Sequence, residues 1–342
     1  MTILRLAAHL QEADGVRQRF LICDPGDMGA IKSKISEAFP ALRNAEVRAL
    51  DSQAAIDSIP PSDYSIATFW TTAYLLLKVQ NTGYKFYIIQ DYEPEFYPAG
   101  TMSALAQLTY RFGFYGIANT QSVHDVYEQQ YGGRAVTLSP SVDTTVFYPG
   151  PDLPSEGRLR LFCYTRPSVH RNCFELAAAA FRIVKQRLGD RVEIICAGEP
   201  WKPQDCGLEG QVKMVGLLPY AQTGDLYRSC HVGLSMMMTP HPSYIPFELM
   251  ACGTLVVANR NAANSKLLKD GENCLISEPI ASCLAETLID GLLNYDTHAP
   301  LRRRAAAMIR ADHSDWTASL KDVAAFMREP ERSLTRKEGA AG

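Results

Sequence analysis

The stretch TPHPSYIPFELMACGTLVV, from Thr239 to Val257, places a polar turn directly before a helix and a buried strand. Pro242 and Pro246 stiffen this turn, and Glu248 lies in the first turn of the expected helix. A turn this polar beside buried elements indicates the rim of a binding site. We expect the backbone N–H groups of residues 243–245 to be held so that they can face an anion.

Short apolar runs alternate with amphipathic ones along nearly the whole chain. RFLICD, KFYIIQD, LRLFCYT, VEIICAG and VGLSMM read as strands, and helical patterns lie between them. This alternation predicts parallel sheets covered by helices on both faces. The Pro- and Gly-rich stretch FYPGPDLPSEG, residues 147–157, interrupts the pattern and is typical of a linker between two α/β domains.

Composition excludes several classes of protein. The chain has 342 residues, 46% hydrophobic, with a net charge of −3, which suits two globular domains and gives no electrostatic reason to bind nucleic acid. The nine scattered cysteines and the lack of a signal peptide or an apolar membrane span favour the cytoplasm. No G-x-G-x-x-G, P-loop or H-E-x-x-H motif occurs. The run of arginines at 302–304 is expected to be a solvated helix face.

Polar residues that follow the strands are the candidates for a site, because ligands of open parallel sheets bind at the carboxyl ends of the strands. Arg166 and Arg171 follow LRLFCYT and precede a helix, which suits a phosphate, although both could be exposed loop residues. Glu248 could equally favour its helix through the dipole. Four residues after KFYIIQ could supply a base or bind hydroxyl groups, or be solvated turn residues. They are Gln90, Asp91, Tyr92 and Glu93.

Taken in order, these stretches resemble family 4 glycosyltransferases of the GT-B fold. SVDTTVFYP resembles the end of their N-terminal domain, and YTRPSVHRN resembles their diphosphate motif, with Arg171 in place of the usual Lys. VGLLPYAQTGDLYRSCHVGLSMM resembles the stretch that contacts the base, and PFELMACGTLVVAN and LKDGENCLI resemble the end of the nucleotide-binding domain. The resemblance covers about residues 84–327.

The resemblance implies an α/β fold of two Rossmann-like domains, whose parallel sheets face each other across a cleft, and a C-terminal helix that crosses back to the first domain. The expected parts are an acceptor-side domain at 1–149, a nucleotide-sugar-binding domain at 157–310, a crossover helix at 311–328 and a disordered tail at 329–342. The first domain is expected to be abbreviated, or to rely on a partner or a missing upstream segment, because few residues precede RFLICD and no Gly-Gly loop opens the chain.

One departure from the family narrows the resemblance. The family usually carries two glutamates with seven residues between them; Glu248 fits the second, but Pro240 stands at the first. The retaining mechanism common in the family therefore does not carry over directly. The loop TPHPSYIPFE, together with QDYEPEFYPAG, resembles a narrower group. These are bacterial rhamnosyltransferases of the rhamnan-building WsaF type, which use dTDP-L-rhamnose.

The resemblance also implies roles for single residues. Glu248 would bind the donor ribose. If the reaction inverts, a carboxylate must take the proton of the acceptor hydroxyl, with Asp91 as first and Glu93 as second candidate; either could instead bind sugar hydroxyls. The donor diphosphate would contact Arg166, Arg171, Ser243 and Tyr244. The donor sugar or its surroundings would contact Gln90, Tyr92, His241 and Ile245. No metal and no cofactor is expected, because arginines and directed N–H groups stabilise the leaving diphosphate.

The expected function is transfer of L-rhamnose from dTDP-L-rhamnose to a growing surface polysaccharide. The family implies a lipid-linked saccharide acceptor and work in the cytoplasm, peripherally at the inner face of the membrane. A donor-binding pseudoenzyme or partner module is an alternative, motivated by the missing glutamate and the short first domain. A sugar-nucleotide epimerase shares the two-lobed fold, but YTRPSVHRN favours a transferase.

Overall fold

A computed structural model of the chain describes residues 2–261, 263 and 266–332. The chain divides into two compact units: the first combines the residues up to Leu138 with those from Thr317 onward, and the second runs from Ser139 to Trp316. The division comes before the Pro- and Gly-rich stretch, because Val142 and Phe147 are buried in the core of the second unit. Of the tail expected to be disordered, residues 333–342 lie outside the described residues.

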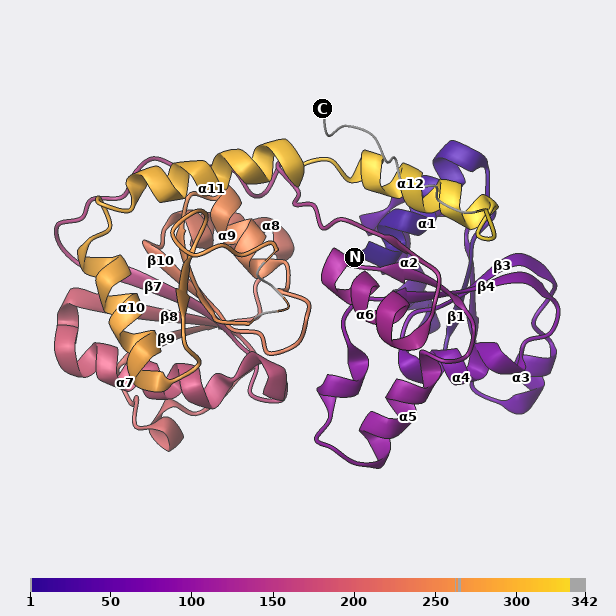
Figure 1. Ribbon diagram of the computed structural model, residues 1–342, viewed down its shortest axis with the longest axis horizontal. Helices are drawn as coiled ribbons and strands as arrows, with labels where there is room; N and C mark the ends of the chain where they lie inside the picture. Colours follow the sequence, from indigo (N-terminus) through magenta and orange to yellow (C-terminus); the bar gives the residue numbers. More distant parts are fainter. Residues whose placement is uncertain (1, 262, 264–265, 333–342) are drawn as a thin grey trace. The chain divides into compact units, whose positions relative to one another are not determined.

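The second unit is built on a six-stranded parallel sheet with the order β12-β11-β10-β7-β8-β9 (Figure 1). Its strands are β7 (Leu159–Thr165), β8 (Val192–Gly198), β9 (Val212–Gly216), β10 (Val232–Ser235), β11 (Leu255–Asn259) and β12 (Leu275–Ser277). This is the doubly wound order of a Rossmann fold, in which the chain reverses its direction across the sheet between β7 and β10. Ligands of such sheets bind at the carboxyl ends of the strands beside this switch point.

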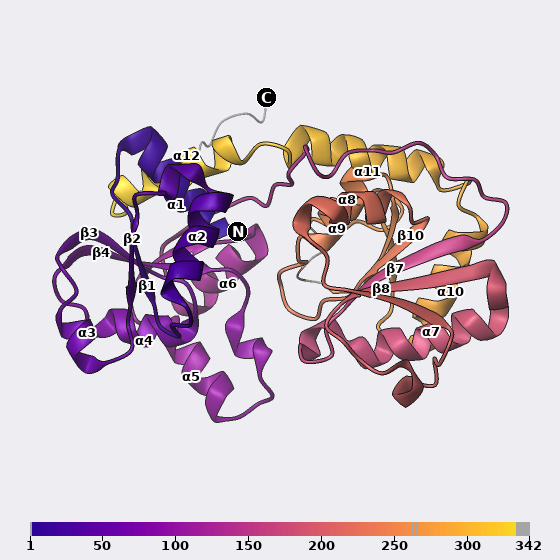
Figure 2. The same ribbon diagram turned by 180° about the vertical axis from the view of Figure 1, so that it is seen from behind.

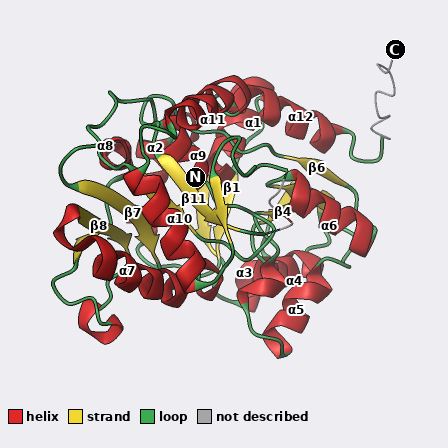
Figure 3. Ribbon diagram, turned by 60° about the vertical axis from the view of Figure 1, so that its left-hand side comes forward, coloured by secondary structure: helices red, strands yellow, loops and turns green. Residues whose placement is uncertain are grey.

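Alternate residues of these strands enter two different cores. Leu161 and Cys163 of β7 lie in the core under α7 and α10, whereas Phe162 lies in the core under α8, α9 and α11. The helices are α7 (Phe174–Leu188), α8 (Tyr220–Arg228), α9 (Ile245–Ala251), α10 (Ala281–Leu293) and α11 (Ala299–Asp312). Figure 3 shows helices on both sides of these strands. Burial on both faces explains why the strands read as continuous apolar runs.

The first unit contains two separate parallel sheets. Four strands pair in chain order: β3 (Ser62–Ala67), β4 (Thr82–Ile89), β5 (Tyr115–Ala118) and β6 (Ala135–Thr137). The helices around them are α3 (Gln53–Asp57), α4 (Trp70–Lys78), α5 (Thr101–Thr109) and α6 (Gln121–Tyr131). A second sheet pairs β1 (Arg19–Ile22) with β2 (Glu46–Ala49), and α1 (Thr2–Asp14) and α2 (Met28–Ala38) lie beside it (Figure 2). The sequence analysis placed no element before β1, so α1 is a finding of the structure.

Helix α12 (Trp316–Arg328) packs on the first unit, as the resemblance implies. The ring of Phe326 lies 6.2 Å from that of Phe86 on β4 and 6.1 Å from that of Tyr115 on β5. Among the described residues, no helix is both long and apolar enough to cross a membrane.

The arginine run on α11 is not a uniformly solvated face. Arg302 is only 5% exposed, donates to Asp152 Oδ1 at 3.1 Å and lies over the ring of Tyr295. Arg303 and Arg304 are exposed. The expectation was wrong for Arg302, because the helical period turns this residue toward the sheet while its two neighbours face solvent.

Candidate active site

The loops after β7 and β10 lie beside the switch point of the second unit. The loop after β7 carries Arg166 and Arg171, and the segment after β10 leads through His241 into α9. Because β7 and β10 are paired neighbours, their carboxyl ends place both loops at one edge of the sheet. The sequence-predicted donor residues of the second unit therefore come from adjoining loops.

Arg166 is held by a carboxylate from the neighbouring strand end. Its Nε lies 3.4 Å from Oε1 of Glu199, which directly follows β8. Ser168 donates to the same carboxylate from its backbone N–H at 3.1 Å and from its hydroxyl at 2.7 Å. These hydrogen bonds from Ser168, and then the Arg166 guanidinium, lower the pKa of Glu199. These contacts hold the first turn of the loop after β7 against the residue that follows β8.

Trp201, three residues after the end of β8, is partly buried against the start of α7. Its Nε1 donates to Thr165 Oγ1 at 3.1 Å, and its ring meets that of Phe174 edge-on at 4.8 Å. The indole supports the end of β7 and the start of α7.

Arg171 lies beside the segment after β10. Its backbone carbonyl accepts a hydrogen bond from the N–H of Met238 at 3.0 Å, and Asn172 donates to the carbonyl of Met236 at 3.3 Å. His241 is 7% exposed, and burial together with the Arg171 guanidinium lowers its pKa to about 4. The imidazole is therefore neutral at physiological pH, and the guanidinium of Arg171 carries the positive charge at this place.

Ser243 and Tyr244 have backbone conformations of opposite hand. Ser243 has φ +70°, which is rare for a residue with a Cβ, and Tyr244 has φ −83° and ψ −20°. A left-handed residue followed by a right-handed one turns successive N–H groups into a concave nest that suits an anion. Ile245 follows as the first residue of α9.

Glu248 projects from α9 into a partly buried position. Tyr227 Oη on α8 donates to its Oε2 at 3.4 Å. Burial raises the pKa of Glu248 to about 7, and the Tyr227 hydrogen bond opposes this shift only in part. Near neutral pH the carboxyl group is poised between its two protonation states.

Two asparagines that the sequence analysis did not single out shape the segment after β10. Asn259, at the end of β11, accepts from the N–H of Met237 at 2.7 Å and donates to its carbonyl at 2.9 Å. Asn261 donates to the carbonyl of Thr239 at 2.7 Å. The sequence signal for Asn259 is an amide that ends the apolar strand LVVAN at the ligand-binding edge of the sheet, and Asn261 follows two residues later.

Asp91 follows β4 in the first unit and is 4% exposed. Its Oδ1 accepts from the N–H of Tyr92 at 2.8 Å, and its carbonyl accepts from Tyr110 Oη at 3.1 Å. Gln90 donates to the carbonyl of Thr68 at 3.3 Å. Asp91 is therefore a fixed carboxylate at the carboxyl end of a central strand.

Glu93 is built into the scaffold. It is 1% exposed, and its Oε2 accepts at 2.6 Å from both the N–H of Trp70, which begins α4, and the hydroxyl of Tyr87. One residue earlier, the hydroxyl group of Tyr92 is hydrogen-bonded to that of Tyr131. A carboxylate held by an interior helix end and a buried phenol is suited to fixing the fold rather than to taking a proton.

Glu95 is a further carboxylate that the sequence analysis did not select. Desolvation of its carboxyl group, and then the charge of Asp91, raise its pKa. Glu95 is exposed, whereas Asp91 is buried. The QDYEPE run therefore contains two buried carboxylates and one exposed carboxylate, and the charge of the buried Asp91 acts on the exposed Glu95. Among the described residues, no group of three or more His, Cys, Asp or Glu side chains is arranged to hold a metal ion.

Sequence models of the WsaF family match both parts of the chain. The WsaF N-terminal domain matches residues 41–123, and the WsaF C-terminal domain matches residues 159–289. The O-antigen biosynthesis protein RfbC of Myxococcus xanthus is 41% identical over 324 residues, which are 94% of this chain and 25% of that protein. The chain thus spans about a quarter of the length of this relative.

Solved glycosyltransferases share the fold at low identity. HepE of Anabaena, in complex with UDP and glucose, matches with a TM-score of 0.72 and 16% identity over 95% of each chain. Sucrose-phosphate synthase of Thermosynechococcus elongatus matches with a TM-score of 0.64 and 15% identity, over 89% of this chain and 78% of that one. The two WsaF domain matches together cover more than half of the chain, and these solved structures share its fold. The chain therefore belongs to the WsaF-type glycosyltransferases of the GT-B fold.

Proposed function

We propose that the protein transfers L-rhamnose from dTDP-L-rhamnose to a growing bacterial surface polysaccharide. The observation that carries the proposal is the set of cationic and polar groups at the switch point of the second unit. Arg171, the nest at Ser243–Tyr244 and Glu248 come from the two loops where a doubly wound sheet binds a nucleotide. The WsaF family and the O-antigen relative support the sugar and the product class.

In this proposal the second unit binds the donor and stabilises its leaving group. The bond between the anomeric carbon and the diphosphate breaks, and the electron pair stays on the diphosphate oxygen. Arg166, Arg171 and the N–H groups at Ser243 and Tyr244 stabilise the developing charge. This needs no metal ion, so we expect no cofactor. Glu248 accepts hydrogen bonds from the ribose hydroxyls.

The first unit supplies the base for the acceptor. An acceptor hydroxyl forms the new bond to the anomeric carbon and gives its proton to the carboxylate of Asp91. Gln90 and Tyr92 flank this carboxylate along the chain, and with His241 and Ile245 they are the proposed contacts of the sugar. The proposed acceptor is a lipid-linked saccharide, which places the protein in the cytoplasm at the inner face of the membrane.

A thermal-shift comparison tests the donor assignment. Wild type, Arg171→Ala and Arg191→Ala would be heated with dTDP-L-rhamnose, UDP-glucose and GDP-mannose. Arg191 is an exposed arginine directly before β8, at the opposite edge of the sheet, and is the matched control. A donor at 100 times its dissociation constant stabilises the protein by about 2.7 kcal/mol.

We expect dTDP-L-rhamnose to shift wild type and Arg191→Ala and not Arg171→Ala. A shift by UDP-glucose or GDP-mannose alone would overturn the rhamnose assignment. A dTDP-L-rhamnose shift without transfer to any saccharide acceptor and without donor hydrolysis would instead indicate a donor-binding module.

A further inference from the structure

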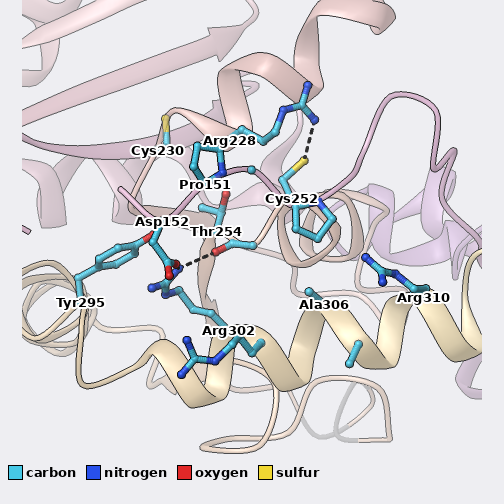
Figure 4. A pocket seen from close by; sticks show the side chains of 15 residues that line it. Pro151, Asp152, Arg228, Cys230, Cys252, Thr254, Tyr295, Arg302, Ala306 and Arg310 are labelled. Carbon is cyan, nitrogen blue, oxygen red and sulfur yellow. Dashed lines mark hydrogen bonds and ion pairs between the residues drawn. The ribbon is translucent and has the colours of Figure 1, made fainter. Parts of the chain in front are cut away.

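A pocket with several charged side chains in its lining lies at the opposite edge of the same sheet from the candidate donor site. Its volume is about 320 Å³, and it lies where β10 and β11 begin, between the end of α9, α11 and the residues 149–152 (Figure 4). The segments that lead to Arg171 and to Glu248 on α9 leave the sheet at the other ends of β7 and β10. The donor site therefore does not account for this pocket.

The lining is strongly cationic. It contains four arginines, namely Arg228, Arg302, Arg303 and Arg310, and one carboxylate, that of Asp152. Figure 4 shows Arg302 and Arg310 projecting from α11 on the pocket side. So much positive charge around a hollow of this size favours an anionic ligand.

Two of the four arginines are built into the walls. Arg228 Nη1 donates to the carbonyl of Val146 at 2.9 Å, and its guanidinium lies 3.8 Å from the ring centre of Tyr148. Arg302 is paired with Asp152, as described above, and donates to the carbonyl of Gly253 at 3.3 Å. These contacts hold the segment before β7 against α8 and α11.

The other two arginines, Arg303 and Arg310, do not hold the walls of the pocket together. Within the described part of the chain, neither Arg303 nor Arg310 makes an ion pair or a side-chain hydrogen bond, and both are exposed. They are seven residues apart on α11, which puts them on one face of the helix. Ala306 and Ala307 lie between them on the helix, and their small side chains leave the pocket open at this place. Two uncompensated guanidinium groups on either side of small residues form a cradle for a phosphate.

We propose that this pocket binds a phosphate ester, with Arg303 and Arg310 as its ligands. The volume exceeds that of an inorganic phosphate, and it lies at the lower end of the roughly 300–1,000 Å³ of ligand pockets. The phosphate could be that of a soluble phosphorylated molecule or of a lipid headgroup. Its binding would be independent of the donor.

Calorimetric titration of the full chain with inorganic pyrophosphate tests this proposal. We expect two sites in wild type, because the donor site also takes a diphosphate. Arg171→Ala should lose one site, and the double variant Arg303→Ala/Arg310→Ala should lose the other, with affinity about tenfold lower or worse. Arg304→Ala removes an exposed arginine of the same helix that does not line the pocket, and it should keep both sites.

The proposal is overturned if the double variant binds pyrophosphate with the stoichiometry and affinity of wild type, or if Arg304→Ala loses as much. Loss of the Arg171-dependent site alone would bear on the donor assignment and not on this pocket. Thermal unfolding of the double variant close to that of wild type verifies that the substitutions leave the fold intact.

Vesicle flotation separates the two sources of phosphate. Phosphatidylcholine vesicles with and without phosphatidic acid would be offered to wild type and to the double variant. Binding that requires phosphatidic acid, is displaced by pyrophosphate and is lost in the double variant supports a lipid headgroup. Pyrophosphate binding without vesicle binding supports a soluble phosphorylated ligand. Equal vesicle binding by the double variant overturns a lipid in this pocket.

Discussion

At the scale of single residues, Asp91 and Glu93 belong to one turn but differ in the groups that they contact. Glu93 accepts two 2.6 Å hydrogen bonds from the interior, from the start of α4 and from Tyr87. Asp91 is held through its backbone by Tyr110, and its charge raises the pKa of Glu95 on the surface. The environment thus favours Asp91 as the base and Glu93 as its support.

Asp91→Asn should lower kcat by about 100-fold or more, because an amide cannot accept the acceptor's proton. The free energy of unfolding should change little, because an amide oxygen can still accept from the N–H of Tyr92. Transfer rates under saturating donor and a denaturant titration measure the two quantities.

Glu93→Gln should have the converse effect. An amide would weaken two charge-assisted hydrogen bonds in the interior, so the free energy of unfolding should fall by about 2–4 kcal/mol. Donor affinity should stay close to wild type, because the proposed contacts of the donor's diphosphate and ribose lie in the second unit. Full stability of Glu93→Gln with a large loss of kcat would assign the base to Glu93 instead.

The affinity for dTDP-L-rhamnose should depend on pH through Glu248. Its pKa lies at about 7, and only the ionised carboxylate accepts hydrogen bonds from both ribose hydroxyls. Affinity should therefore be about tenfold lower at pH 6 than at pH 8. Calorimetry at the two pH values measures this, since the sugar-linked diphosphate itself stays ionised over this range. Glu248→Gln should bind more weakly and lose the pH dependence; a dependence unchanged in that variant would refute the role of Glu248.

At the scale of elements, the ends of β7 and β8 approach too closely for any side chain at one position. Gly198 has φ +118°, and a Cβ there would lie 2.3 Å from the carbonyl oxygen of Thr165. The same carbonyl accepts from the N–H of Glu199, which holds Arg166. The glycine thus determines the geometry of the loop that carries the first arginine.

Gly198→Ala should lower the free energy of unfolding by about 2–4 kcal/mol, from strain and displacement of the β7 carbonyl. It should also weaken donor binding, because Glu199 and Arg166 move with that carbonyl. Gly210→Ala is the control: φ is +67°, and no atom lies within 4 Å of its Cβ, so only the backbone strain of about 1–2 kcal/mol is expected. Equal effects of the two substitutions would show that the close approach is unimportant.

At the scale of the whole molecule, the chain returns to its first unit through α12. The helix completes the face of the first sheet with Phe326, which is buried against rings of β4 and β5. The first unit therefore depends on residues from both ends of the sequence, whereas the second is continuous.

Phe326→Ala should destabilise the first unit by about 3–5 kcal/mol, because it leaves a cavity between rings. Hydrogen exchange should increase in peptides of β4 and β5, while peptides of β7 and β10 and the thermal shift by the donor stay as in wild type. A uniform increase in both units would contradict an independent second unit.

The sequence by itself determined the α/β class, most of the strands and the residues that follow them, because periodicity and turn chemistry are local properties; the short strands β6 and β12 were not predicted. It also placed Arg166, Arg171 and Glu248 after the correct elements. It did not predict α1, the separate pairing of β1 with β2, or the first boundary between the units. These depend on which distant segments bury each other's apolar faces.

Only the tertiary structure decided which polar groups meet. Strand order placed the loops after β7 and β10 together, and it set Asn259 against the backbone of Met237. Packing buried Arg302 between Asp152 and the ring of Tyr295, and it fixed Glu93 at the start of α4. The local sequence around a polar residue does not state its partners, because hydrogen bonds and burial are set by elements far away in the chain. The candidate site residues were readable one by one, whereas their contacts depend on neighbours that are distant in the sequence.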